Sequence, residues 1–513
     1  MQRILFFGDG FLKKYSKHLS LLLSLSIIFI SGCAKNQEDD SKKQLSANKD
    51  YDIFIYNSDT SIGKAFREMC DEYTKKTGVI IRTVTPSEEE STYSNLESFI
   101  NSEYPPSIFT LNSIDELKLS QQSENIWDFN NATEDSFKEM VNTIPEGIRL
   151  SSNSSDSFGV PTTLEGYGFV VDPKMLSSLF GGDKYRKVIN DLKACSYEEF
   201  NYFVEALNSY ISSGAISEFK LNEKDYTFLE AGRGLSKNLK GVFSFSGSNS
   251  KIFGSYIMNP ILASIFSLPS DAYNANEDEV NNLENPISKY VELLDLISSN
   301  AAGESSKLNR GAELISTSKN STSQSIKNFV KGKSVFLIAT TKDYENMSIF
   351  DSLAAKRFIF IPFKVPVTDY DLDSSGKSLN KNLNKSLGIN VPRYFCINSR
   401  STDHEKKAAQ DFLVWYASSD LAKKYIVSEF GYVPYNIDDG SILDNPLERS
   451  MIDYIKENKF LPPIFSGAPK SWTDDIMGKY VINSLLNKPY WNYDDYENTS
   501  KYAIDEWKKL KSN

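Results

Sequence analysis

Short apolar runs alternate with amphipathic stretches in the first part of the chain. Residues 53–56 predict a short buried strand and residues 79–84 a second strand, and the apolar residues between them repeat at helical spacing until Gly78. This order predicts a parallel strand-helix-strand unit with a right-handed crossover. A weaker helical pattern over residues 93–102 leads to a third strand over residues 105–111. The pattern therefore indicates an α/β fold.

The stretch 159–173 combines glycines with isolated polar groups before it becomes an apolar strand. Glu165 and Tyr167 each stand beside a glycine, and Asp172-Pro173 closes the strand. We interpret this stretch as a crossing from one lobe to another, with Glu165 and Tyr167 facing the gap. An ordinary strand with a glycine bulge is the alternative.

Later segments continue the α/β pattern. Helices are expected over residues 197–211 and 287–297, in a pair that follows the cap at residues 401–403, and in the C-terminal region. Strands are expected over residues 241–249, 334–339, 357–365 and 388–398, with the third at a sheet edge because it contains Pro362. Residues 300–325 are rich in Ser, Asn and Lys and predict an exposed loop.

Small polar residues follow several of the predicted strands. In open parallel sheets, ligands bind beyond the carboxyl ends of the strands. Candidate ligand-binding residues at such ends are Asn57, Ser58, Asn112, Ser113, Gly247, Ser248, Thr341 and Lys342. Helix caps and turns are the alternative role for each of these residue types.

The N-terminus has the pattern of an export signal. Basic residues precede an apolar run over residues 19–30, which is too short to span a membrane as a helix. The Ile30-Ser31-Gly32-Cys33 sequence resembles a bacterial lipoprotein signal. That resemblance implies a signal peptide over residues 1–32, palmitate-type acyl chains on Cys33 and a polar tether over residues 33–49. A secretory signal that happens to contain a cysteine is the alternative.

Composition narrows the range of partners. The 513 residues are too many for one core, so at least two domains are expected. Removing residues 1–32 takes away four basic side chains and one acidic one, which changes the formal charge from −11 to −14. An acidic body disfavours nucleic acid and anionic membrane surfaces as partners. The cysteines at 70, 195 and 396 are predicted to be buried free thiols.

Catalytic signatures are scarce. Of the two histidines, His18 leaves with the signal peptide and His404 lies in a charged capping turn. The sequence has no HExxH, CxxC, phosphate-loop or EF-hand motif, so no metal, no cofactor and no enzymatic activity are expected. Neutral polar groups with aromatics suit a sugar or polyol. A secreted glycoside-active enzyme that uses Glu165, or a surface adhesin with a degenerate cleft, remain as alternatives.

The order of motifs resembles the extracellular solute-binding proteins of ABC importers, carbohydrate type (family 1, maltose-binding-protein-like). The resemblance rests on the lipoprotein signal, the 159–173 stretch, and the sequences Phe-Val-Lys-Gly-Lys at 329–333, Ala-Ala-Gln-Asp-Phe-Leu-Val-Trp at 408–415 and Gly-Tyr-Val-Pro at 431–434. It covers nearly the whole chain after the signal.

This resemblance implies a two-lobe periplasmic-binding-protein fold of type II. Each lobe would be a mostly parallel sheet flanked by helices, with the ligand cleft at the hinge. Lobe 1 would comprise residues 50–163 and 388–435, and lobe 2 residues 164–387 and 436–513. The protein would be a monomeric, lipid-anchored receptor outside the cytoplasm that delivers a sugar or oligosaccharide to ABC permease subunits.

The resemblance also implies particular sugar contacts. Asn57, Ser58, Glu165 and Trp472 stand where family members commonly touch sugar, although core packing is the alternative for Trp472 and for Tyr167. Two departures are visible: Pro106-Ser107 replaces the usual Pro-Asp, and residues 340–342 replace a Gly-x-Trp stacking platform. The missing platform favours a smaller glycan than a long maltodextrin.

Overall fold

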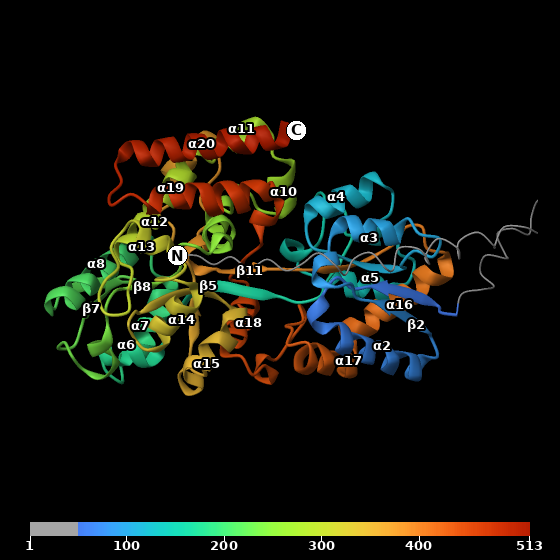
Figure 1. Ribbon diagram of the computed structural model, residues 1–513, viewed down its shortest axis with the longest axis horizontal. Helices are drawn as coiled ribbons and strands as arrows, with labels where there is room; N and C mark the ends of the chain where they lie inside the picture. The colour runs from blue at the N-terminus through green and yellow to red at the C-terminus, as the bar shows by residue number, and fades with distance from the viewer. Residues whose placement is uncertain (1–49, 513) are drawn as a thin grey trace, which may run out of the picture. The chain divides into compact units, whose positions relative to one another are not determined.

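The computed structural model describes residues 50–512, and these form two main β-sheets with helices around them (Figure 1). The first sheet has the strand order β2-β1-β3-β12-β4. Its strands are β1 (Ile53–Tyr56), β2 (Ile81–Val84), β3 (Ile108–Leu111), β4 (Val160–Pro161) and β12 (Tyr394–Ile397). Strand β1 is parallel to β2 and β3, and β12 is antiparallel to β3 and β4.

Helix α2 (Gly63–Thr77) joins β1 to β2 and confirms the expected strand-helix-strand unit. It buries Phe66, Met69 and Tyr73 against the sheet. The helix ends at Gly78, whose φ of 80° lies in the left-handed region, and the Gly78 N–H donates to the carbonyl of Thr74 at 2.8 Å.

The second sheet has the order β13-β11-β5-β9-β8, and β10 also pairs with β5. Its strands are β5 (Glu165–Val171), β8 (Phe243–Ser244), β9 (Phe336–Thr340), β10 (Ile359–Ile361), β11 (Leu387–Asn390) and β13 (Phe460–Leu461). Strand β5 is antiparallel to β9, β10 and β11. A small separate hairpin is made by β6 (Glu218–Leu221) and β7 (Lys224–Thr227).

The α/β class is confirmed, but the expectation of mostly parallel sheets is wrong. Both sheets are mixed: β12 and β5 are antiparallel to their neighbours, and each enters its sheet directly from a strand of the other sheet. The direction of each of these two strands is therefore set by its crossing from the other sheet and not by a strand-helix-strand unit within its own sheet.

The helices that follow the strands of the first sheet are α2, α3 (Tyr93–Ile100), α4 (Ile114–Gln122), α5 (Asp135–Asn142), α16 (Asp403–Ser418) and α17 (Asp420–Lys424). The helices between β5 and β11 are α6 (Pro173–Phe180), α7 (Tyr185–Ala194), α8 (Tyr197–Ser213), α9 (Asn259–Leu262), α10 (Pro269–Asn274), α11 (Glu277–Asn281), α12 (Glu284–Ser299), α13 (Ala312–Ile315), α14 (Thr322–Val330) and α15 (Tyr344–Ala355). The last are α18 (Pro446–Lys456), α19 (Ile482–Leu486) and α20 (Tyr493–Ser512), and α20 packs against α12. None of the helices in residues 50–512 has both the length and the apolar content that a bilayer crossing requires.

Two hydrophobic clusters form the core, and β5 contributes to both. Phe169 and Val171 belong to one cluster and Val170 to the other, as expected for a strand buried on two faces. The exposed loop expected over residues 300–325 is only partly present, because Leu314 and Asn320 are buried there. The thiols of Cys70, Cys195 and Cys396 are buried and free as predicted, and burial raises the pKa of each.

Candidate functional site

Two short connections join strands of one sheet to strands of the other. Residues 162–164 join β4 to β5, and residues 391–393 join β11 to β12. The Thr162 N–H donates to the Arg393 carbonyl at 3.0 Å, and the Leu164 N–H donates to the Val433 carbonyl at 2.9 Å. A connection of three residues spans on the order of 14 Å at most, so the ends of the strands that it joins lie near each other.

Strands β4 and β5 thus belong to different sheets, in line with the crossing inferred from the 159–173 stretch. The exact lobe boundaries stay a prediction. Residues 388–390, which were assigned to lobe 1, pair with β5 in the second sheet.

The first sheet contributes a group that we name the Asp59 cluster: Asp59, Asn57, Arg393 and Tyr432. Asp59 follows β1, and its carboxylate accepts a bond from the Ser61 N–H at 3.0 Å and lies 2.5 Å from Arg393 Nη1. It also accepts from the Tyr432 hydroxyl. Asn57 Oδ1 accepts from the Asp59 N–H at 3.0 Å, whereas Asn57 Nδ2 is buried without a partner among the described residues. The cluster therefore joins the β1 turn to two later segments of the chain.

The second sheet contributes the Glu165 cluster: Glu165, Asn390, Lys342 and Lys251. Glu165 begins β5, and its Oε2 accepts from Asn390 Nδ2 at 3.0 Å on the paired strand β11. Its Oε1 forms an ion pair with Lys342 Nζ, at the carboxyl end of β9. The Glu165 side chain is 6% exposed and that of Lys342 is 63% exposed. A shielded acid is therefore held by one buried amide and one exposed cation.

The surroundings of Glu165 are rich in groups that respond to its charge. Partial burial lowers the pKa of the Lys251 ammonium. The Glu165 carboxylate counteracts this lowering, and the Lys342 ammonium adds to it. Burial, with a smaller contribution from Glu165, raises the pKa of Tyr256. Burial also raises the pKa of Asp343, which hydrogen bonds from Thr340 oppose. This edge of the second sheet is thus a dense, partly desolvated set of polar groups.

Three candidates near the first sheet support local structure. The Ser58 N–H donates to Thr110 Oγ1 at 2.8 Å, and the same threonine hydroxyl donates to Ser58 Oγ at 2.8 Å. Ser113 caps α4 by accepting from the Glu116 N–H at 3.2 Å, which is the capping role considered above as the alternative. The Asn112 N–H donates to the Glu116 carboxylate at 2.6 Å, and its side chain remains exposed.

The candidates near the second sheet are placed differently from one another. Lys342 joins Glu165, as described. Thr341 is buried, and its carbonyl accepts from Asn445 Nδ2 at 2.9 Å. Gly247 is buried, and its N–H donates to the Leu314 carbonyl at 2.9 Å. Ser248 is exposed, and its hydroxyl forms a hydrogen bond with the Ser246 hydroxyl at 2.8 Å.

The two aromatic candidates are buried. Trp472 is 0% exposed, its indole N–H donates to the Ala503 carbonyl at 2.7 Å, and its ring meets that of Trp507. The structure thus favours the core-packing alternative for Trp472. Tyr167 stacks on Tyr256 with ring centroids 4.3 Å apart, and its hydroxyl is buried without a hydrogen bond among the described residues.

Sequence reasoning missed Asp59, Arg393, Asn390 and Lys251. Asp59 lies in the same polar turn as the predicted Asn57 and Ser58. Asn390 and Arg393 are isolated polar residues in an otherwise apolar stretch after residue 386, and that isolation was a usable signal. Lys251 had no such signal, because it follows a run of small polar residues at 246–250 and does not stand out from them.

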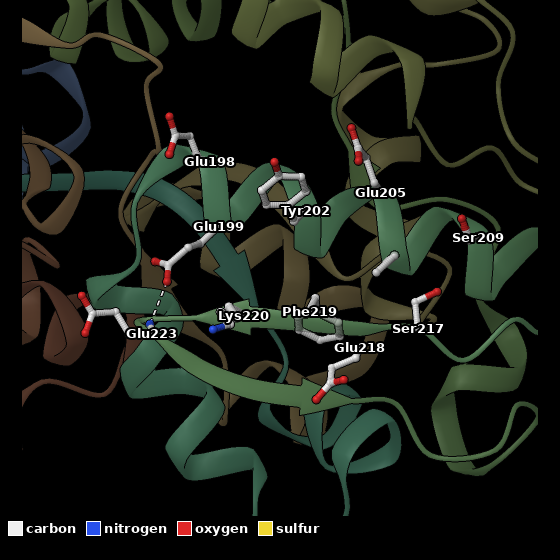
Figure 2. A pocket seen from close by; sticks show the side chains of 11 residues that line it. Glu198, Glu199, Tyr202, Glu205, Ser209, Ser217, Glu218, Phe219, Lys220 and Glu223 are labelled. Carbon is white, nitrogen blue, oxygen red and sulfur yellow. Dashed lines mark hydrogen bonds between the residues drawn. The ribbon is translucent and has the colours of Figure 1, made fainter.

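A separate surface pocket of about 830 Å³ lies between α8 and the β6-β7 hairpin (Figure 2). Its lining is largely acidic, with Tyr202 and Phe219 among the carboxylates. The Glu223 N–H donates to the Glu199 carboxylate at 2.7 Å across it. None of the predicted site residues lines this pocket. In the part of the chain that the structure describes, no group of three or more His, Cys, Asp or Glu side chains is arranged to hold a metal ion.

The solved structures similar to this chain include several solute-binding proteins. A family 1 extracellular solute-binding protein from Bifidobacterium longum subsp. infantis matches at a TM-score of 0.57 and 15% identity, over 89% of this chain and 98% of that one. This chain has the fold of the family 1 extracellular solute-binding proteins. The expectation drawn from the motif order is therefore confirmed for the fold.

Two further structures of this fold resemble the chain. The apo form of RafE from Streptococcus pneumoniae matches at a TM-score of 0.57 and 12% identity, over 90% of this chain and 97% of that one. A cyclo/maltodextrin-binding protein complexed with maltotetraose matches at a TM-score of 0.52 and 13% identity, over 90% of this chain and 98% of that one. No protein-family model and no curated protein matches the sequence. Since the identities are low, these likenesses establish the fold alone.

Proposed function

We propose that this protein is a substrate-binding receptor of an ABC importer that takes up a sugar or oligosaccharide. The observation that carries the proposal is the Glu165 cluster, because Glu165 and Asn390 lie directly beside the two short connections between the sheets. Its solvent-accessible donors are of the kind that fix sugar hydroxyls, and a solute-binding fold surrounds it.

In this proposal the sugar lies between two lobes centred on the two sheets. The connections 162–164 and 391–393, with the hydrogen-bonded Val433 segment, act as the hinge. Closure brings polar groups of both sheet edges to one ligand and excludes water, which strengthens every hydrogen bond in the site. The closed form is then the conformation that the permease recognises.

Export and lipid anchoring complete the proposal. Residues 1–49, with Cys33, lie outside the described residues, so the signal peptide, the acyl chains and the tether stay predictions from the sequence. An anchored receptor outside the cytoplasm keeps its ligand near the permease. A radiolabelled palmitate incorporation assay on the wild-type protein and a Cys33→Ala variant tests the anchor, and the variant should lose the label.

Titration calorimetry with a panel of glycans tests the receptor function directly. The expected result is saturable binding to at least one glycan, with no product released after prolonged incubation. If none of the neutral or charged glycans binds, the proposal is wrong. If a glycan is hydrolysed, the protein is an enzyme and not a receptor.

A further inference from the structure

Lys251 is a cation without an anion in the Glu165 cluster. It is an exposed residue with helical backbone geometry that directly precedes the π-helix η6 (Ile252–Ile257). Its ammonium is 5.4 Å from the centre of the Tyr256 ring, and Tyr256 stacks on Tyr167 of β5. Among residues 50–512, no carboxylate lies within ion-pair distance of Lys251 and no hydrogen-bond acceptor is assigned to it.

The carboxylates around Lys251 and its neighbour Tyr256 are already engaged by other partners. Glu165 is held by Asn390 and Lys342. Asp343 accepts from the N–H and the hydroxyl of Thr340, at 2.8 and 3.0 Å. Asp474 is paired with Lys470. The ammonium of Lys251 therefore keeps three unused donors on the side of the site that the Glu165 cluster forms.

An unmatched cation in partly desolvated surroundings favours an incoming anion. The neighbouring protein removes part of the water that would stabilise the charge, and this lowers the pKa of Lys251. A carboxylate or sulfate restores that stabilisation through charge-assisted hydrogen bonds, which are about twice as strong as neutral ones. A hydroxyl group of a neutral sugar restores less of it.

We propose that the sugar bound at this site carries an acidic group, a carboxylate or a sulfate, and that Lys251 binds this group. The inference rests on the proposed receptor function and adds the chemical class of its ligand. Lys342 takes part indirectly, because its pairing with Glu165 leaves Lys251 as the cation free to meet the ligand.

Calorimetry with matched pairs of acidic and neutral glycans separates the effect of ligand charge on affinity from the effect of ligand shape. The pairs are trigalacturonate and its methyl ester, sialyllactose and lactose, and a sulfated and an unsulfated form of one disaccharide. The preferred acidic member should bind at least about tenfold more tightly than its neutral counterpart, the size expected for one charge-assisted hydrogen bond. Raising the ionic strength should reduce this preference.

Variants of Lys251 test its role. Lys251→Met should abolish the preference for the acidic member, and Lys251→Arg should retain most of it. Lys64→Met is the matched control, because Lys64 is 92% exposed on α2 and belongs to neither cluster. Its affinities should equal those of the wild type. Thermal unfolding of every variant confirms that the comparison is made between folded proteins.

The outcomes distinguish the two proposals. Binding of neutral glycans as tightly as acidic ones, or an acidic preference that survives Lys251→Met, overturns the role of Lys251 and leaves the receptor function intact. If no glycan of either kind binds, the receptor function fails and this inference fails with it. If Lys251→Met loses the preference for acidic glycans while Lys251→Arg and Lys64→Met keep it, the result supports both the receptor function and the role of Lys251.

Discussion

The Asp59 and Glu165 clusters each contain a shielded carboxylate paired with a cation, yet their cations differ in exposure. Arg393, the partner of Asp59, is 25% exposed, whereas Lys342, the partner of Glu165, is 63% exposed. Asp59 also holds the Tyr432 hydroxyl and a backbone N–H. The Asp59 cluster is thus a rigid connection between crossing segments, and the Glu165 cluster, which we propose as the ligand site, has an exposed partner that a ligand can replace.

Removing the Asp59 carboxylate should cause the largest loss of stability. Asp59→Ala leaves the Arg393 guanidinium and the Tyr432 hydroxyl without their shared acceptor. We expect the free energy of unfolding to fall by about 2 to 4 kcal/mol, measured by urea denaturation. Asp135→Ala, whose side chain is 93% exposed on α5, should change it by less than about 0.5 kcal/mol. Equal effects of the two variants would contradict a rigid connection at Asp59.

A methyl group at Gly388 should cause the next largest loss. In β11 this glycine lies against the Tyr167 ring, and an added Cβ would collide with it. Gly388→Ala should lower the free energy of unfolding by about 1 to 3 kcal/mol. The double variant Gly388→Ala with Tyr167→Ala should lose less than the sum of the two single variants. Strict additivity would show that the collision is relieved elsewhere.

Glu165→Gln should affect ligand binding more than stability. The amide keeps an acceptor for Asn390 and releases only an exposed lysine, so the free energy of unfolding should change by less than about 1 kcal/mol. Affinity for the neutral glycan that binds best in the panel should fall by about tenfold, as expected when one hydrogen bond to a charged group is lost. Calorimetry gives the affinity. A large stability loss with unchanged affinity would make the Glu165 cluster a rigid connection like that of Asp59.

The smallest effect should be a pH signal from the second sheet. Burial raises the pKa of Glu448, on α18 behind β5 and β10, to about 7 from an ordinary 4.5. Between these values the folded state retains a proton that the unfolded state has lost, so stability falls as the pH rises through this window. Glu448→Gln should match the wild type near the lower value and exceed it by about 1 kcal/mol above pH 7. The free energy of unfolding is measured by urea denaturation across this pH range. If it changes with pH equally in the wild type and in Glu448→Gln, Glu448 is not the cause of the pH dependence.

The sequence predicted much of the fold because short buried strands and one-sided helices leave a clear periodicity. β1, α2 and β9 lie close to where that periodicity places them. The periodicity did not reveal that the sheets are mixed, because the direction of a strand depends on the side from which the chain enters the sheet. Residues 162–164 and 391–393 show this return only once the strand pairing is known.

The candidate site was harder to predict because most of its contacts are distant in the sequence. Glu165 was identified from its place between glycines, but its partners Asn390 and Lys342 come from other strands. Trp472 was inferred from the family resemblance, and its buried indole shows that a matching position does not ensure a matching exposure. Exposure is set by packing against residues such as Trp507, which the local sequence does not report.

Backbone hydrogen exchange in the presence and absence of the tightest-binding glycan tests the central claim most directly. A sugar held between the two sheets should slow exchange at residues 57–59 and 340–343 together. Exchange at residues 218–223, which include lining residues of the pocket in Figure 2, should stay unchanged. Protection confined to residues 218–223, or to one sheet only, would contradict a sugar site shared by both.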